Sequence, residues 1–242
     1  MSDVNDPQKG PITAYAAGGL FTQFELAGNV LLKDAIWRLS GGRFCLFLPQ
    51  SREARQLKIP DIKAHIRNTD LLGVVESDIL LANFDGLDLD SGTVVEFIFA
   101  KMLGKPAVIL RTDFRRQYST GLSEPFNLMV KNWPRSLEIM LDSFVVNANL
   151  VDAARKCQPE DTTSSLLMEA EMTAVQHAME QTAGKVIDAM EEVVRMENPY
   201  PPDLREEVYR TARLSPGHGF DELVNEKKLD EIIQRLKDNG TF

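Results

Sequence analysis

The stretch from Asp78 to Leu110, DILLANFDGLDLDSGTVVEFIFAKMLGKPAVIL, has the pattern of a strand, an acidic loop, a helix and a second strand. The apolar run 79–82 is short and bounded by turn residues, which is typical of a buried parallel strand. From Thr93 to Leu103 the apolar residues recur at helical spacing, and Gly104 ends that helix before the next apolar run. Ligands of such a unit bind outside the carboxyl ends of the strands, so the sequence predicts a crevice there.

Two carboxylates of this stretch are predicted to face that crevice. Asp90 ends the acidic loop, and Glu96 follows six residues later in the first turns of the helix. Paired carboxylates can cleave a bond to an anomeric carbon, because one can attack the sugar and the other can move a proton. The alternative is an N-capped helix with solvated acids, since carboxylates stabilise the amino end of a helix.

Strand and helix patterns alternate over residues 12–110, which predicts a doubly wound, mainly parallel α/β sheet of five strands with helices on both faces, as in flavodoxin-like and Rossmann-like folds. The expected strands cover 12–17, 43–48, 79–82 and 107–110, and the expected helices cover 23–39, 61–77 and 93–103. Residues 137–146 are expected to pass from helix to strand. The apolar side of the first helix is predicted to consist of Phe24, Ala27, Val30, Leu31, Ala35 and Ile36.

The chain is predicted to consist of a flexible leader (1–11), a compact catalytic domain (12–149) and an all-helical extension (150–242). After a polar linker over 157–164, the extension has three amphipathic helix patterns, at 165–198, 203–214 and 220–237. These helices could form a small bundle, dock on the compact domain or pair between subunits.

Composition excludes several classes of function. The net charge is −9, which argues against nucleic acid or an anionic membrane as a partner. No apolar run reaches membrane-spanning length, and residues 1–11 lack the apolar core of a signal peptide. Cys45 and Cys157 do not make a disulfide framework, so a reducing cytoplasm is expected. Three scattered histidines and the absence of CxxC, HExxH, GxGxxG and GxxxxGK[ST] predict neither a metal nor a nucleotide cofactor.

Four segments appear in an order that resembles the nucleoside 2-deoxyribosyltransferase family. They are YAAGGLFT at 15–22, NTDL at 68–71, DSGTVVE at 90–96 and PFNLM at 125–129. The third matches the family signature D-x-G-T-x-x-E and is the most specific. The resemblance covers roughly residues 12–146 and does not explain residues 150–242.

The resemblance implies transfer of 2-deoxyribose between nucleobases by double displacement on 2′-deoxynucleosides, without a cofactor. Glu96 would attack C1′ and form a deoxyribosyl-glutamate intermediate, which a second nucleobase would then resolve. Asp90 would handle the proton of the base, and Tyr15 would hydrogen-bond to Glu96 and position it. Each residue also has a plain structural alternative; Tyr15, for example, could be a core aromatic of its strand.

The resemblance also implies how substrate binds. Asp70 and Gln50 would lie near the nucleobase, and Asn127 would reach the sugar 5′-hydroxyl, often from a neighbouring subunit, so a homo-oligomer is expected. Structural alternatives are a solvated helix residue for Asp70, a loop residue for Gln50 and a turn residue for Asn127. Substrate-binding positions carried over from the same motifs are Gly18, Phe21, Gly92 and Met129.

Two departures from the family pattern affect base selectivity more than the reaction. Gly19 stands where a proline is common, and Phe97-Ile98 replace small residues after the glutamate. Two other functions stay open: hydrolysis of 2′-deoxynucleoside 5′-monophosphates, although no serine-rich phosphate cradle is evident, and a non-catalytic nucleotide-binding module. The choice between purines and pyrimidines, and between a base and water as acceptor, also stays open.

Overall fold

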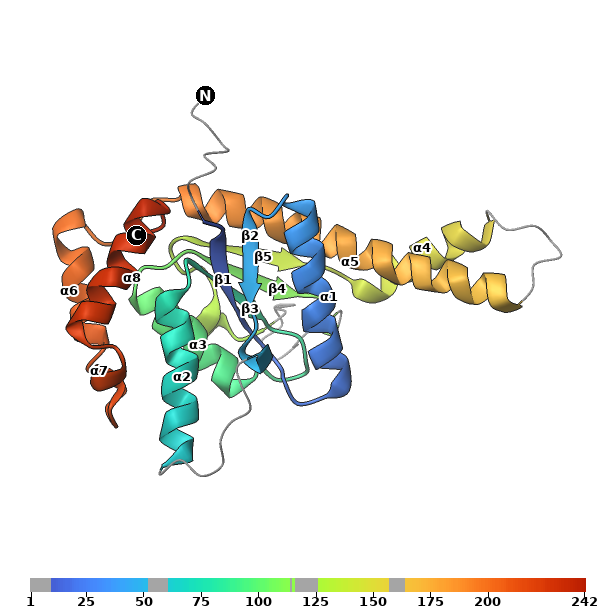
Figure 1. Ribbon diagram of the computed structural model, residues 1–242. Helices are drawn as coiled ribbons and strands as arrows, with labels where there is room; N and C mark the ends of the chain where they lie inside the picture. Colours follow the sequence, from blue (N-terminus) through green and yellow to red (C-terminus); the bar gives the residue numbers. More distant parts are fainter. Residues whose placement is uncertain (1–9, 52–60, 114, 116–125, 157–163) are drawn as a thin grey trace.

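The computed structural model describes residues 10–51, 61–113, 115, 126–156 and 164–242, and shows a five-stranded sheet flanked by helices (Figure 1). All strand pairs are parallel, in the order β2-β1-β3-β4-β5, so the predicted doubly wound α/β fold is confirmed. The strands are β1 (Ile12–Ala17), β2 (Phe44–Phe47), β3 (Ile79–Asn83), β4 (Ala107–Arg111) and β5 (Ser136–Met140).

Alternate residues of the buried strands supply two cores, one on each face of the sheet. On one face, Ala14 and Val108 pack with α1 (Gln23–Leu39) and the second half of α5 (Ser164–Arg195). On the other, Tyr15 and Ile109 pack with α2 (Ile62–Glu76) and α3 (Ser91–Met102). The second face is the one that carries the predicted catalytic residues.

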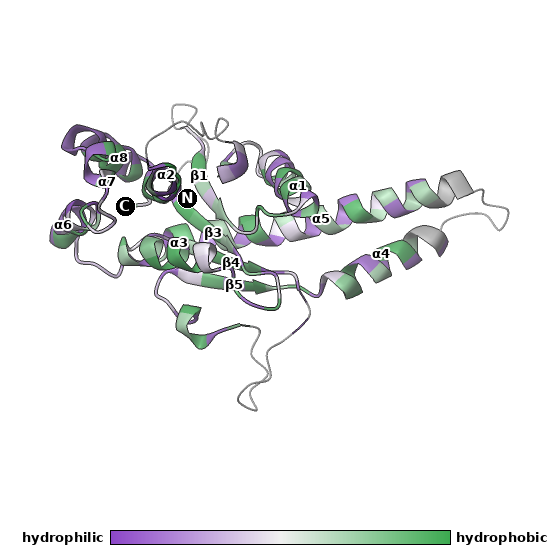
Figure 2. Ribbon diagram, turned by 90° about the horizontal axis from the view of Figure 1, so that it is seen from below, coloured by the Kyte–Doolittle hydropathy of each residue, from purple (hydrophilic) through white to green (hydrophobic). Residues whose placement is uncertain are grey.

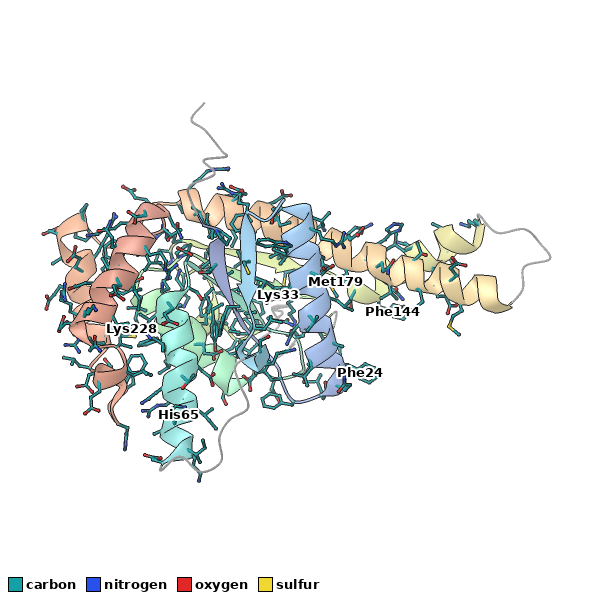
Figure 3. All side chains as sticks on the ribbon, in the orientation of Figure 1. Phe24, Lys33, His65, Phe144, Met179 and Lys228 are labelled. Carbon is teal, nitrogen blue, oxygen red and sulfur yellow. The ribbon has the colours of Figure 1, made fainter. Side chains whose placement is uncertain are left out.

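The orientation predicted for the apolar side of the first helix is wrong in part. Ala35 and Ile36 are buried, but Phe24 is 89% exposed, and Ala27, Val30 and Leu31 also lie on the exposed side. Figure 3 shows Phe24 at the start of α1, pointing away from the sheet. The reason is that α5 meets α1 along a different stripe, and this contact is fixed by residues distant in sequence.

Two further predictions of secondary structure need correction. Residues 137–146 pass from strand to helix, not from helix to strand, because β5 ends at Met140 and α4 (Ser143–Lys156) follows. The predicted helix over 220–237 is two helices, α7 (Phe220–Leu223) and α8 (Glu226–Asp238). The chain breaks there because the Asn225 side chain accepts a hydrogen bond from the Lys228 backbone N–H (3.0 Å) and starts a new helix.

The helix α5 has two different environments along its length. Its second half is buried on the sheet through Ala183, Val186, Met190 and Val193. Its first half extends beyond the sheet and pairs with α4 to form a projecting arm (Figure 1). Most of the predicted linker, and the leader up to residue 9, lie outside the described residues.

The remaining helices, α6 (Pro202–Ala212), α7 and α8, lie beside α2 on the side away from the arm (Figure 2). Their apolar residues share one core with α2, in which Phe220 and Leu229 are fully buried. Within the described residues, no helix is both long and apolar enough to cross a membrane.

Candidate active site

The centre of the site is a hydrogen bond between β1 and α3. The Tyr15 hydroxyl donates to Glu96 Oε1 over 2.6 Å. Tyr15 is fully buried, and its ring stacks on Phe47 of the neighbouring strand at 5.8 Å between centroids. Because a buried strand and the first turns of a helix hold the two partners, the Glu96 carboxylate has little freedom to move.

Asp90 begins the same helix. One carboxylate oxygen, Oδ2, accepts hydrogen bonds from both the backbone N–H and the hydroxyl of Thr93, each over 2.8 Å. A Cβ at Gly92 would stand 3.1 Å from that oxygen, so the glycine permits the close approach. The N-cap alternative weighed for Asp90 is thus present in the structure, and it fixes the carboxylate within two turns of Glu96.

Three carboxylates interact in this site. Burial raises the pKa of Glu96 to about 7, the Tyr15 hydrogen bond lowers it, and the charges of Asp70 and Asp90 raise it. The structure therefore brings Asp70, on α2, and Asp90 within electrostatic reach of Glu96. A glutamate that titrates near neutral pH in a crevice is a candidate for proton transfer or nucleophilic attack.

The turn after β1 is tightly packed. A Cβ at Gly18 would stand 3.2 Å from the Asn83 Cβ at the end of β3, and one at Gly19 would stand 2.4 Å from Glu25 Oε1. Glu25 Oε2 accepts from the backbone N–H groups of Phe21 (2.9 Å) and Thr22 (2.7 Å), which completes a capping box at the start of α1. The glycine at position 19 leaves room for the Glu25 carboxylate in this capping box.

Gln50 lies in the short helix η1 (Pro49–Ser51), next to β1. Its Nε2 donates to the Leu26 carbonyl oxygen (2.9 Å), and its Oε1 accepts from Asn29 Nδ2 (3.0 Å). Sequence reasoning missed Asn29, because nothing in its own helix distinguishes it from a solvated residue.

The remaining predicted residues lie at the surface. Asn127 Oδ1 accepts from the Met129 backbone N–H (2.9 Å) and so caps η2 (Leu128–Val130), which confirms the structural role weighed for it. Phe21 and Met129 are each 77% exposed. Contact of these three side chains with a substrate stays a prediction.

Sequence reasoning also missed the residue that holds the acidic loop. Arg111 ends the buried strand β4 and is only 2% exposed. Its guanidinium donates to the carbonyl oxygens of Phe84, Gly86 (3.0 Å) and Arg115 (2.8 Å). The available signal was a charged residue directly after an apolar run. Arg111 ties the loop that leads to Asp90 to the end of the neighbouring strand.

No metal site accompanies these carboxylates in the part of the chain that the structure describes, where no group of three or more acidic, histidine or cysteine side chains is arranged to hold an ion.

The sequence over residues 14–151 matches the nucleoside 2-deoxyribosyltransferase family. Because the match covers more than half of the chain, the protein belongs to this family, an enzyme class that includes nucleoside deoxyribosyltransferases and related N-glycosidases. The substrates of the class are nucleosides and nucleobases. A search of curated proteins returned no significant match.

Several solved structures are similar to this chain. A conserved protein from Enterococcus faecalis V583 is 30% identical, with 50% of this chain and 84% of that chain covered and a TM-score of 0.44. A 2-desoxiribosyltransferase from Leishmania mexicana is 24% identical (56% and 93% covered, TM-score 0.41). A 2-deoxyribosyltransferase from Bacillus psychrosaccharolyticus is 18% identical (64% and 95% covered, TM-score 0.41).

Proposed function

We propose that this protein transfers 2-deoxyribose between nucleobases on 2′-deoxynucleosides, with Glu96 as the nucleophile. The observation that carries the proposal is the Tyr15–Glu96 hydrogen bond of 2.6 Å beside two further carboxylates. A hydroxyl donor on Glu96 stabilises its ionised form, which is the form that attacks.

In the first step, a Glu96 carboxylate oxygen forms a bond to C1′ while the bond from C1′ to the base nitrogen breaks. The base leaves with the electron pair of that bond, and Asp90 delivers a proton to it. Positive charge that develops on C1′ and O4′ is stabilised by the carboxylate that then traps it. A 2′-deoxy sugar forms this charge more easily because it lacks the electron-withdrawing 2′-hydroxyl.

In the second step, a nitrogen of the acceptor base attacks C1′, the ester bond breaks and Glu96 is regenerated as a carboxylate. Asp90 takes back the proton that the acceptor loses. The raised pKa of Glu96, about 7, supports this cycle, because a carboxylate that titrates near neutral pH can attack C1′ and can also leave it again.

The substrate would bind at the same edge of the sheet, where the strands have their carboxyl ends. Gln50 and Asp70 would face the nucleobase. Gly18 and Gly92 would contact the substrate through their backbone, since neither position has room for a larger side chain beside Asn83 and Asp90. Asn127 would contact the 5′-hydroxyl of a substrate in a neighbouring subunit. The exposed apolar side chains of Met129 and, on α1, of Phe24, Val30 and Leu31 support assembly of a homo-oligomer.

The test is incubation of the purified protein with deoxyinosine, with and without free adenine, followed by chromatography. Deoxyadenosine that forms only when adenine is present, and that Glu96→Gln does not produce, is the expected result. Hypoxanthine release that does not depend on adenine would show that the protein hydrolyses deoxyinosine instead of transferring its deoxyribose. Absence of reaction with every deoxynucleoside and deoxynucleoside monophosphate would overturn the enzyme proposal.

A further inference from the structure

The Gln50 side chain is held by groups that determine which way its amide faces. Gln50 Nε2 donates to the Leu26 carbonyl oxygen, and Gln50 Oε1 accepts from Asn29 Nδ2. Asn29 Nδ2 also lies 3.3 Å from the Gly19 carbonyl oxygen, to which it donates. Both amide side chains are half-buried. Two side-chain amides are therefore linked in series between two backbone carbonyl groups.

This linkage permits only one orientation of each amide. A side-chain amide can in general turn over and exchange its oxygen for its nitrogen. If Gln50 turned over, its oxygen would face the Leu26 carbonyl oxygen, and both groups only accept hydrogen bonds. If Asn29 turned over, its oxygen would face the Gly19 carbonyl oxygen with the same result. The Leu26 carbonyl oxygen holds only the nitrogen of the Gln50 amide. The oxygen of that amide is held by Asn29, whose own orientation the Gly19 carbonyl oxygen fixes.

The pair lies at the edge where the proposed reaction takes place. Gly19 follows the strand of Tyr15 by two residues, and its neighbour Gly18 packs against Asn83 at the end of β3. From this arrangement we propose that Asn29 is a positioning residue that fixes the direction of the Gln50 amide and so determines which nucleobases the site accepts. This inference rests on the proposed function.

The chemical consequence concerns amino and oxo bases. Gln50 keeps one N–H and one oxygen lone pair beyond those already used, and it presents them in a fixed order. Adenine offers an amino donor beside a ring acceptor, whereas hypoxanthine offers an oxo acceptor beside a ring donor. A fixed amide can form both hydrogen bonds with one of the two bases, whereas with the other it places donor against donor and acceptor against acceptor. The site then discriminates because the polar groups of the wrong base stay unpaired.

The experiment compares adenine and hypoxanthine as acceptors, with thymidine as the deoxyribose donor. In Asn29→Ala, the ratio of the two kcat/KM values is expected to move toward one by about three- to tenfold, the value of one hydrogen bond. Asn29→Asp, which keeps the shape but only accepts, should change the ratio at least as far. Both reactions share the thymidine half-reaction, so any change in that half-reaction cancels from the ratio. Lys33→Ala, one turn further along α1, is the matched control, and thermal unfolding checks that each variant folds.

Equilibrium binding of the two free bases separates this inference from the proposed function. One outcome is that the wild type transfers no deoxyribose, yet Asn29→Ala changes the ratio of its dissociation constants for adenine and hypoxanthine. This outcome would overturn transfer and support the role of Asn29. A ratio that stays the same in both Asn29 variants, in turnover and in binding, would overturn the role of Asn29 alone. Failure of the wild type to bind either base would overturn both.

Discussion

Two carboxylates in contact with the same sheet, Glu96 and Asp78, have opposite surroundings. Glu96, near the carboxyl ends of the strands, receives one hydrogen bond from Tyr15 and lies near two other acids, and its pKa is raised to about 7. Asp78, at the amino end of β3, has a fully buried side chain. It accepts from the Thr13 backbone N–H and hydroxyl (2.8 Å each), from Thr241 (2.8 Å) and from Asn239 (3.0 Å), and Arg235 lies at 3.3 Å.

The comparison shows how one fold treats the same chemical group in two ways. At Asp78 a buried charge is matched by donors, so the carboxylate joins β1, β3 and the end of α8. At Glu96, within the described residues, the charge has the Tyr15 hydroxyl as a donor and has two like charges nearby. Such a group lowers the stability of the protein but makes the carboxylate more reactive, a trade-off that is common at active sites.

The largest expected effect is that of Glu96→Gln on catalysis. Loss of the nucleophile should lower transfer by at least about 1,000-fold, measured as deoxyadenosine formed from deoxyinosine. A variant that keeps more than a tenth of the wild-type rate would show that Glu96 is not the nucleophile.

The same variant should be more stable than the wild type near neutral pH. Because the folded pKa of Glu96 lies near 7, above its unfolded value, the wild type loses stability as the pH rises from about 4.5 to 7. Glutamine does not ionise, so the free energy of unfolding of Glu96→Gln, measured in urea, should exceed that of the wild type by an amount that grows over this range to at most about 3 kcal/mol. An equal difference between the two proteins at pH 4 and pH 8 would contradict this account.

Asp78→Ala should affect stability instead of chemistry. It leaves the donors of Thr13, Asn239 and Thr241 unmatched and Arg235 without its buried counter-charge, so we expect a loss of about 3–5 kcal/mol in urea unfolding. Activity per folded molecule should stay within twofold. The control is Asp230→Ala, which breaks an exposed pair with Arg210 and should cost less than about 1 kcal/mol.

Tyr15→Phe removes the hydroxyl that donates to Glu96 and lowers its pKa, and keeps the ring that packs on Phe47. The pKa of Glu96 should then rise above about 7, and the acidic limb of kcat/KM should move to higher pH. We expect activity at pH 6 to fall by about tenfold, with a smaller loss at pH 9. An equal loss at both pH values would mean that Tyr15 does not act through this ionisation.

Asp70→Asn should give the smallest and opposite shift. Removing a like charge lowers the pKa of Glu96, so the acidic limb should move to lower pH. The pH of half-maximal kcat/KM is the measurement, because the asparagine can also change base binding and hence the rate at every pH. Movement of the limb to higher pH would show that Asp70 does not act on Glu96 through its charge.

Much of this architecture could be predicted because its signals are local. The double glycine after β1, the Asp90 cap of α3 and the Gly104 stop each act within a few residues of the element that they define. The order of strands and helices then restricts the topology to a doubly wound sheet. The juxtaposition of Asp90 with Glu96 follows from their spacing on one helix.

The remainder depends on contacts between distant parts of the chain. The buried stripe of α1, which includes Ala35 and Ile36, is determined by its packing against α5. Arg38 of α1 and Glu180 of α5, which form a salt bridge of 3.1 Å, lie 142 residues apart. Likewise, Asn29 can be recognised only once Gln50 is known to lie beside it. Periodicity identifies an amphipathic helix, but it does not say which side meets the sheet.

The donors of Asp78 have a consequence for how the protein is made. Asn239 and Thr241 lie 161 and 163 residues after the aspartate in the chain. A ribosome that adds about 5–20 residues per second needs on the order of ten seconds to travel that distance. During translation, therefore, the strand that begins at Ile79 is made long before the Asp78 carboxylate next to it can accept these two hydrogen bonds. We expect the nascent sheet to remain open at its amino edge until residue 241 emerges, and a stalled ribosome to hold a chain that proteases can still cut.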